Sequence, residues 1–332
     1  MTRITLILMA LVTTFAGADG QVLGSRHDLT AYREYFLKAD DTEPKGGAVR
    51  VTFLGITSLL FDDGETQLLI DACFSRPELA HVLRGKLETD PKVVDGVLKK
   101  AKVERLKAIF VAHSHYDHAL DAAYVASKTG AVLHGSESTL NIGRGGDVEE
   151  KHLVKFKHGQ EVKVGQFAVT TYESKHSPPI RLINDDLGET IDKPLKQPAR
   201  VRDYKEGGSF DFLIRHGNHA VLVTPSTNAI EGELDRVRAD VVFLGTGTLG
   251  NQSKKFRDFY YEQTVGKVKP KLVVAIHWDN FFQPLSDQLE PFAKPIDDVH
   301  AGFDDLIARL KKDKIDFGLM QGYQSVTLFG EK

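Results

Sequence analysis

One short stretch limits the folds open to this chain more than any other. The apolar run 106–112 is typical of a strand buried on both faces. It leads into "HSHYDH", which places four metal-ligating side chains within six positions: His113, His115, Asp117 and His118. Residues two apart in an extended chain point to the same side, so His113 and His115 are expected to face one point.

The other two side chains of this motif fall where the next helix begins. An acidic group such as Asp117 is favoured at a helix N-terminus. A single strand-to-helix turn therefore offers two imidazoles to one point, and a carboxylate with an imidazole to a neighbouring point. Zinc and similar ions accept nitrogen and carboxylate oxygen, so the pattern predicts a pair of metal ions. The alternative is a polar helix cap with incidental histidines.

Composition narrows the function classes. The chain has 332 residues, of which 41% are hydrophobic, and a formal net charge of -3. This length suffices for a sizeable core in one large domain or two small ones. A phosphate-binding surface needs a clear basic excess, so nucleic acid is not an expected partner.

The first residues differ from the rest. Residues 1–18 combine Arg3, a short apolar run and the small residues before position 19, the pattern of a secretory signal peptide cleaved near Ala18. The alternative is a membrane anchor, but the run is too short to span about 30 Å of hydrocarbon. Cys73 is the single cysteine and cannot form an internal disulfide. We therefore expect a periplasmic or secreted bacterial protein with no stable membrane span after cleavage.

Hydrophobic periodicity predicts strands and helices in both halves of the chain. Hairpins are expected to turn at 62–64 and at 217–218, and paired strands at 160–174. Helices are expected at 26–40, 119–130, 252–265 and 297–313, and a last strand at 323–329. Hairpins combined with buried strands and helices favour two packed sheets covered by helices.

The motif and the opening strands resemble the metallo-β-lactamase fold superfamily. The stretches that carry the resemblance are "VTFLGITSLLFDDGETQLLIDACF" and "AHSHYDH". The resemblance implies an α/β four-layer αββα sandwich, with residues 19–332 forming a single domain. It assigns His113 and His115 to a first metal and Asp117 and His118 to a second. Asp71 matches the family's supporting aspartate, which accepts a hydrogen bond from a ligand histidine.

Two further ligands are implied downstream. His176 ends a strand-like run and is the expected third ligand of the first metal, and His277 ends a buried strand and matches the last ligand of the second. For each, the alternative is an ordinary core or surface histidine. The Gly-His-Thr-x-Gly context is absent around His176. This absence points towards the branch that resembles ascorbate-phosphate lactonases and N-acyl-phosphatidylethanolamine phospholipase D.

The chain departs from the family at one position. Ser226, in "LVTPSTN", stands where the family's metal-bridging aspartate is expected. A neutral hydroxyl is a poor zinc ligand, and one negative charge between two cations is missing. Three outcomes are open: a hydroxide bridges the pair, one site is lost, or the site is degenerate.

The remaining candidates concern substrate binding. His134 is a candidate to line the pocket, and Arg144, in the loop-like segment 135–146, to meet an anion, with a surface salt bridge as its alternative. Trp278, with Phe281 and Phe282, forms either an apolar pocket wall or part of the core. An insertion at 178–207 is expected at the pocket rim. His216 and His219 flank a turn and are expected to be solvated.

These observations predict a metal-dependent hydrolase acting on a small-molecule phosphodiester, lactone or related ester or amide. The cofactor is expected to be zinc, as one or two ions, with iron or manganese as alternatives. Asp117 is the candidate catalytic residue that orients the attacking water. The rival hypotheses are a non-catalytic metal- or ligand-binding exported protein with a degenerate site, and an iron-dependent redox protein.

Overall fold

The computed structural model of the chain describes residues 29–179, 186–294 and 296–330. The predicted signal peptide at 1–18 lies outside the described residues. Within the described residues, no helix is both long enough and apolar enough to span a membrane.

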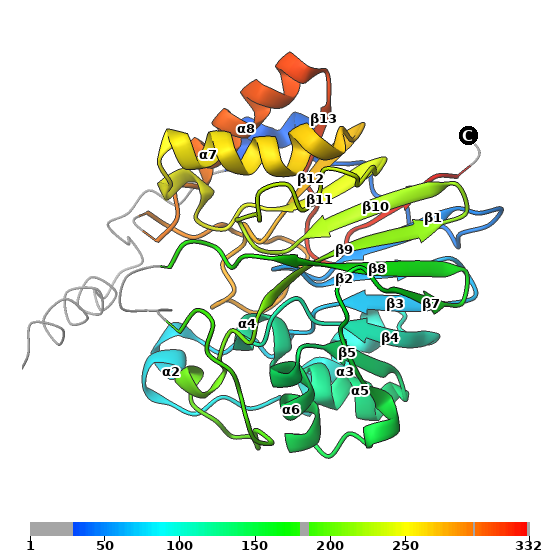
Figure 1. Ribbon diagram of the computed structural model, residues 1–332, viewed down its shortest axis with the longest axis vertical. Helices are drawn as coiled ribbons and strands as arrows, with labels where there is room; N and C mark the ends of the chain where they lie inside the picture. Colours follow the sequence, from blue (N-terminus) through cyan, green and yellow to red (C-terminus); the bar gives the residue numbers. More distant parts are fainter. Residues whose placement is uncertain (1–28, 180–185, 295, 331–332) are drawn as a thin grey trace, which may run out of the picture.

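Two mixed sheets form the centre of the molecule (Figure 1). The first sheet has the order β14-β1-β2-β3-β4-β5-β6, and its strands are Ser325–Leu328, Val49–Phe53, Leu59–Asp62, Gln67–Ile70, Leu106–Phe110, Val132–Gly135 and Leu153–Lys155. The second has the order β13-β12-β11-β10-β9-β8-β7, and its strands are Asp316–Gly318, Leu272–Ile276, Val241–Gly245, His219–Thr224, Ser209–His216, Phe167–Ser174 and Glu161–Val164.

Helices cover the outer face of each sheet (Figure 1). Five lie on the side of the first sheet: α2 (Leu79–Arg84), α3 (Pro91–Lys100), α4 (Tyr116–Ala119), α5 (Ala122–Thr129) and α6 (Glu137–Gly145). Two lie over the second: α7 (Lys254–Tyr261), continued by a π-helical turn (Glu262–Gly266), and α8 (Val299–Asp313). Short 3-10 turns occupy Leu29–Tyr35, Glu150–His152, Val201–Asp203 and Leu249–Asn251. The predicted αββα sandwich is confirmed.

Aromatic side chains hold the two sheets together. The rings of Phe61 and Phe243, from different sheets, lie 6.1 Å apart in an edge-on contact, and those of Phe110 and Phe212 lie 5.9 Å apart. All four are fully buried. Each such burial contributes roughly 1.5–3 kcal/mol, so the relative position of the two sheets is well fixed.

Both predicted hairpins form, as β2 with β3 and β9 with β10, and β7 pairs with β8. The expected helix at 26–40 is shorter than predicted, since only Leu29–Tyr35 is helical among its described residues. The segment 135–146 was expected to be a loop and is helix α6. Its start is determined by Ser136, whose side chain accepts a hydrogen bond from the Thr139 N–H.

The two turn histidines differ. His216 was expected to be solvated, but it is buried and its Nε2 lies 3.2 Å from an Asp63 oxygen. The buried carboxylate gives the ring a polar partner inside the protein, which the sequence pattern did not reveal. His219 stays partly exposed and stacks on Phe329.

Candidate metal centre

The candidate ligands come from the ends of strands in both sheets. His113 follows β4 of the first sheet, while His176 and His277 follow β8 and β12 of the second. The remaining side chains belong to α4, the helix that follows β4: His115 is its N-cap, and Asp117 and His118 lie within it. The packing of the sheets therefore brings residues up to 164 positions apart (113 to 277) to one edge.

Three non-glycine residues at this edge have a strained backbone conformation. His277, Asp71 and Ile56 have φ angles of 60°, 50° and 56°, in the left-handed region that non-glycine residues rarely adopt. The three are bonded into their surroundings: the Ile56 carbonyl accepts from the His277 N–H, and the Asp71 N–H donates to the Phe110 carbonyl. Such conformations persist where the surrounding structure enforces them, often at functional sites.

The ligand atoms form two overlapping groups. The first group is His113, His115 and His176, and the second group is His113, Asp117 and His118; within each, the ligand atoms lie within 4.8 Å of one another. His277 stands beside the second group, with its Nε2 3.5 Å from an Asp117 oxygen. The structure thus gathers all six predicted ligands, with His113 between the two groups.

Hydrogen bonds to the outer ring nitrogens orient two of the histidines, His176 and His118. A carbonyl or carboxylate oxygen can only accept, so a ring nitrogen beside one carries the proton. The His176 Nδ1 donates to the Ser177 carbonyl at 2.8 Å, and the His118 Nδ1 donates to Asp71 at 2.8 Å. The Nε2 of each ring is therefore left as a lone pair facing the site.

The electrostatics of the site favour the neutral rings of His113 and His176 and the charged carboxylate of Asp117. Burial and the neighbouring His115 lower the pKa of His176 to about 3, and burial with the other site histidines lowers the pKa of His113 well below its usual range. Burial alone would raise the pKa of Asp117, but His118 and His277 outweigh it and lower the pKa. Neutral imidazole and ionised carboxylate are the forms that bind metal.

Several buried ring nitrogens of the site have no hydrogen-bond partner. His113 is 1% exposed, yet neither of its ring nitrogens has a hydrogen-bond partner, and the same holds for His118 Nε2 and His277 Nδ1. A buried polar atom left unsatisfied costs about 1–3 kcal/mol. A nitrogen-rich set of this kind, with one carboxylate, fits a divalent ion such as zinc. The residues present therefore fit the metal that the motif implies.

Asp71 lies where the predicted supporting role requires it. It is fully buried, and its carboxylate accepts from the Thr57 hydroxyl, from the Ala112 N–H at 2.7 Å and from His118 Nδ1. These bonds connect the end of β3 to the end of β4 and to His118 of the motif.

Ser226 is buried in the loop after β10 and belongs to neither group. Its carbonyl accepts from the Tyr260 hydroxyl at 3.2 Å. The same loop holds the His176 segment, because Asn228 Nδ2 donates to the His176 carbonyl and the Thr227 N–H donates to the Ser177 hydroxyl, both at 2.8 Å. The loop after β10 thus contacts the metal centre through the His176 backbone.

Of the three candidate substrate residues, two are buried and the third is paired with acidic side chains. His134 is buried and stacks on Phe110 in the core, and burial lowers its pKa to about 4. Arg144 pairs with Glu137 and Glu150, which is the surface salt bridge of the alternative interpretation. Trp278 is fully buried against Phe53, in agreement with core packing.

One residue beside the first group, Asp186, was not predicted from the sequence. An Asp186 oxygen lies 3.2 Å from His115 Nε2. Asp186 belongs to the predicted insertion, whose residues 180–185 lie outside the described residues. The sequence offers no spacing that singles it out, since the insertion contains six acidic residues and the contact depends on how the chain returns to β9.

An aromatic cluster lies beside His277 and Tyr116. The Phe281 ring lies 5.8 Å from His277 and 6.4 Å from Tyr116, in edge-on contacts, and also packs on Phe282 and Phe292. Phe281 and Phe282 are partly exposed. An apolar surface therefore borders His277.

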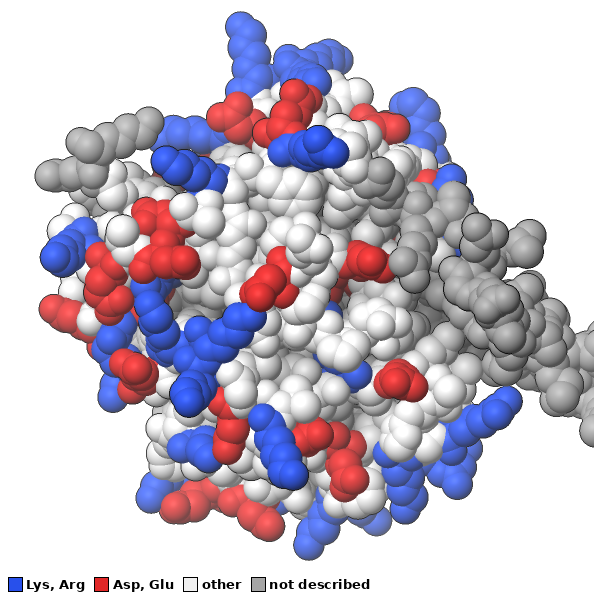
Figure 2. Space-filling view, turned by 180° about the vertical axis from the view of Figure 1, so that it is seen from behind, with Lys and Arg blue, Asp and Glu red and all other residues white. Residues whose placement is uncertain are grey.

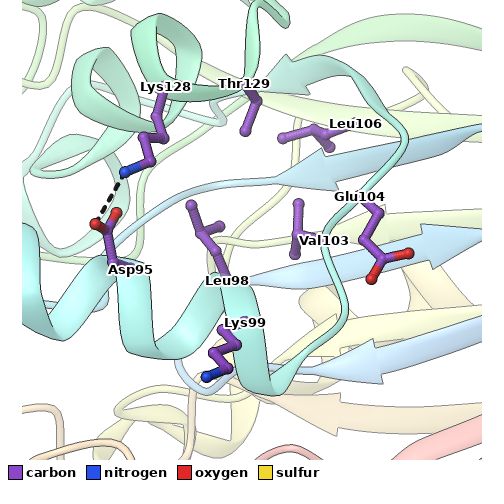
Figure 3. Close-up of a pocket in the computed structure, with 8 residues that line it drawn as sticks. All are labelled: Asp95, Leu98, Lys99, Val103, Glu104, Leu106, Lys128 and Thr129. Carbon is purple, nitrogen blue, oxygen red and sulfur yellow. Dashed lines mark hydrogen bonds and ion pairs between the residues drawn. The ribbon is translucent and has the colours of Figure 1, made fainter.

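A separate hollow lies far from the histidines (Figure 3). It has a volume of about 450 Å³ and is lined by residues of α3, of the loop after α3, and of α5, and by Leu106, with Lys128 paired to Asp95 at its edge. Leu106 begins β4 and His113 follows its end, so roughly 20 Å of chain separates the two places. The hollow is not part of the metal centre.

Comparison with known proteins places the chain in a family. Residues 66–278 match the model of the β-lactamase superfamily domain, which is more than half of the chain. This range begins just before β3 and ends just past His277. The chain belongs to this family and has the metallo-β-lactamase fold.

Two curated relatives share part of its sequence. Both are described as metal-dependent hydrolases: one from Chloroflexus aurantiacus is 35% identical over 79 residues, and one from a Roseiflexus species is 28% identical over 91 residues. The matches cover 24% and 27% of this chain and 32% and 37% of the relatives. The chain thus spans about a third of the length of these relatives.

Solved structures share the fold at low sequence identity. An isothiocyanate hydrolase from Delia radicum gut bacteria has a TM-score of 0.53 at 12% identity, covering 83% of this chain and 98% of that one. Igni18, a metallo hydrolase from Ignicoccus hospitalis, has a TM-score of 0.51 at 15% identity, covering 86% of this chain and all of that one. At these identities the likeness concerns the fold alone.

Proposed function

We propose that the chain is a metal-dependent hydrolase whose reaction takes place at the two histidine groups. The observation that carries the proposal is the arrangement at His113, a buried ring with two unpartnered nitrogens between the two groups. The description of both curated relatives as metal-dependent hydrolases supports the same class of activity.

The chain's own residues have distinct roles in this reaction. The first group and the second group, with His277, would hold one or two divalent ions; zinc suits the nitrogen-rich donors best. A bound ion supplies a water of lowered pKa and polarises the oxygen under attack. Asp117 stays ionised beside His118 and His277, so it can accept a hydrogen bond from the attacking water and orient it.

The substrate proposed is a small molecule with a phosphodiester, lactone or related ester or amide bond. The partly exposed Phe281 and Phe282 beside His277 would contact an apolar substituent of such a substrate. The resemblance to the lactonase-like and phospholipase-like branch favours the first two bond types. We further propose export of the protein to the periplasm or medium, on the basis of residues 1–18; N-terminal sequencing of the mature protein tests the cleavage near Ala18.

The test of the function is metal-dependent turnover. The purified protein is assayed with bis-p-nitrophenyl phosphate, a lactone panel and a chromogenic cephalosporin, before and after removal of metal by a chelator. We expect hydrolysis of at least one phosphodiester or lactone, its loss with the metal, and its return when zinc is added. An Asp117→Asn variant that still binds zinc is expected to lose most of this activity. Turnover that survives complete metal removal would contradict the proposal.

One observation favours a second candidate, a non-catalytic metal-binding protein. Ser226 adds no carboxylate to either group, so the centre has one charged ligand, Asp117, among five histidines. Such a protein would bind zinc and hydrolyse nothing in the panel. Metal analysis also tests the third candidate, an iron-dependent redox protein, which would contain iron in place of zinc.

A further inference from the structure

We propose that Asp186 is a positioning residue of the first group: it holds His115 in the orientation that directs its Nδ1 into the metal site. This inference rests on the proposed metal-dependent function and adds a residue outside the ligand set. It also assigns a role to the insertion: residues 186–188 and 206–207, here called the stem, would take part in building the metal site.

The first step is the orientation of the His115 ring. Its Nδ1 lies 3.1 Å from the Nε2 of His176, inside the first group. Its Nε2 lies on the other side of the ring, 3.2 and 3.3 Å from the two Asp186 oxygens. A carboxylate accepts and does not donate, so Nε2 carries the proton and Nδ1 presents its lone pair to the site.

The second step is how Asp186 itself is held. The Glu206 N–H donates to an Asp186 oxygen at 3.2 Å, and the Glu206 side chain accepts from the Gly188 N–H at 2.6 Å and from the Ser209 hydroxyl at 2.8 Å. Glu206 is buried. Glu206 therefore links residues 186–188 of the insertion to the start of β9, with Asp186 on the side of His115.

A backbone hydrogen bond also joins this stem to the motif. The Ser114 N–H, between the first two motif histidines, donates to the Glu206 carbonyl at 2.8 Å. The space here is filled, since a Cβ on Gly207 (φ 71°) would lie within 2.6 Å of Ser138 atoms and 2.8 Å from the Ser114 hydroxyl oxygen. The stem thus contacts the motif through both its backbone and Asp186.

The consequence is that metal binding at the first group depends on the insertion. Carboxylates that accept from a ligand histidine fix its ring and raise its basicity, and their loss typically lowers metal affinity about 10–100-fold. Asp186 is 16% exposed and comes from a loop stem, so this support is less rigid than a strand end.

The test compares Asp186→Ala and Asp186→Asn with Asp192→Asn, a matched control in the same insertion. Asp192 is exposed and accepts from Thr190, two residues away. Zinc affinities of the two sites are measured by competition with a chromophoric chelator, and the His115 ring N–H is followed by NMR in the metal-free protein, with His115→Gln for assignment.

We expect Asp186→Ala to weaken one zinc site about 10–100-fold, to leave the other unchanged, and to abolish the protected Nε2–H signal. Asp186→Asn keeps an accepting oxygen without the charge, so its affinity should fall between those of Asp186→Ala and the wild type. Asp192→Asn should match the wild type. The proposal is overturned if Asp186→Ala retains wild-type zinc affinity at both sites, or if the wild-type ring shows no protected Nε2–H.

The positioning role of Asp186 and the proposed hydrolase function can be contradicted independently of each other. If the wild type binds zinc, hydrolyses nothing in the substrate panel, and is still weakened at one site by Asp186→Ala, the positioning role stands without the hydrolase. Metal-free unfolding temperatures of both Asp186 variants within a few degrees of the wild type show that the change is local. A loss of zinc at both sites with a collapsed unfolding transition in both variants would overturn the positioning role.

Discussion

The two histidine groups differ in what supports the outer nitrogen of their rings. In the second group, His118 donates to Asp71, which is fully buried at the end of β3 and accepts from two further donors. In the first group, His115 faces Asp186, which is partly exposed in the stem of an insertion. In both groups a carboxylate accepts a hydrogen bond from the outer nitrogen of a histidine, but one carboxylate is at a strand end and the other is in a loop. This difference predicts that the second group is the more firmly preorganised.

The largest effect is expected from Asp71→Asn. It removes the charge behind His118 and leaves one of three buried donors poorly matched, so zinc affinity of the second group should fall about 10–100-fold. The metal-free protein should also lose roughly 1–3 kcal/mol in free energy of unfolding. Chelator competition and urea unfolding measure the two quantities. Asp95→Asn, at an exposed carboxylate on α3, is the control. Equal zinc affinities in both variants would show that Asp71 does not support the second group.

A second prediction concerns pH and follows from His176 in the first group. Its pKa is about 3 in the folded protein and about 6.5 in the unfolded chain. The contribution of the neutral ring to the free energy of unfolding is therefore fully present above about pH 6.5. It decreases as the pH falls towards 3, by up to roughly 1.4 kcal/mol per pH unit. The lowered pKa of His113 acts in the same sense, and the raised pKa of His277 in the opposite one.

The measurement is urea unfolding of the metal-free protein at several pH values between 7.5 and 4.5. Because glutamine does not titrate, His176→Gln should show a flatter dependence than the wild type. Identical slopes for the two proteins would mean that His176 is not held neutral by its surroundings.

A smaller change is expected from Ser226→Asp. A carboxylate in the loop after β10 would add negative charge near the centre, so the more weakly bound ion should bind on the order of tenfold more tightly. Ser226→Ala is the matched control for loss of the hydroxyl. Metal titration of the two variants gives the comparison. Equal affinities would show that position 226 does not face the space between the two groups.

The smallest effect is expected from Arg144→Ala. Arg144 pairs with two largely exposed glutamates, and such pairs contribute less than about 1 kcal/mol. The variant should retain zinc affinity and KM for any substrate found. A KM raised more than about tenfold would restore Arg144 as an anion-binding residue.

The parts of the fold and site that the sequence predicted are those determined by local pattern. Alternation and turn residues located both hairpins, and the spacing of the motif located His113, His115, Asp117 and His118 on one strand-to-helix turn. The resemblance to a known superfamily added Asp71, His176 and His277, which local pattern alone leaves as ordinary residues. The structure brings all of them to one edge of the sandwich.

What the sequence did not predict depends on contacts between distant segments. His216 is buried because β9 brings it to Asp63. Asp186 lies beside His115, and it accepts a hydrogen bond from Glu206, twenty positions later in the chain. Nothing in the spacing of these residues reveals their partners. The net charge of the insertion does not single out Asp186 either.

The mixture of positive and negative side chains on the surface agrees with the small net charge of the chain. Lysine and arginine alternate with aspartate and glutamate over the face shown in Figure 2, with no extended region of one sign. A small-molecule substrate remains our proposal, and it requires no large charged surface of one sign.

The most direct test of a metal centre built from two groups around His113 is the metal content of the wild type and of His113→Ala. Both are purified without added metal and analysed by inductively coupled plasma mass spectrometry, with circular dichroism to verify folding. Because His113 belongs to both groups, we expect at least one zinc ion per wild-type chain and less than about a tenth of that in the folded variant. A wild-type protein with less than about half an ion per chain, or a His113→Ala variant that keeps its zinc, would contradict the account.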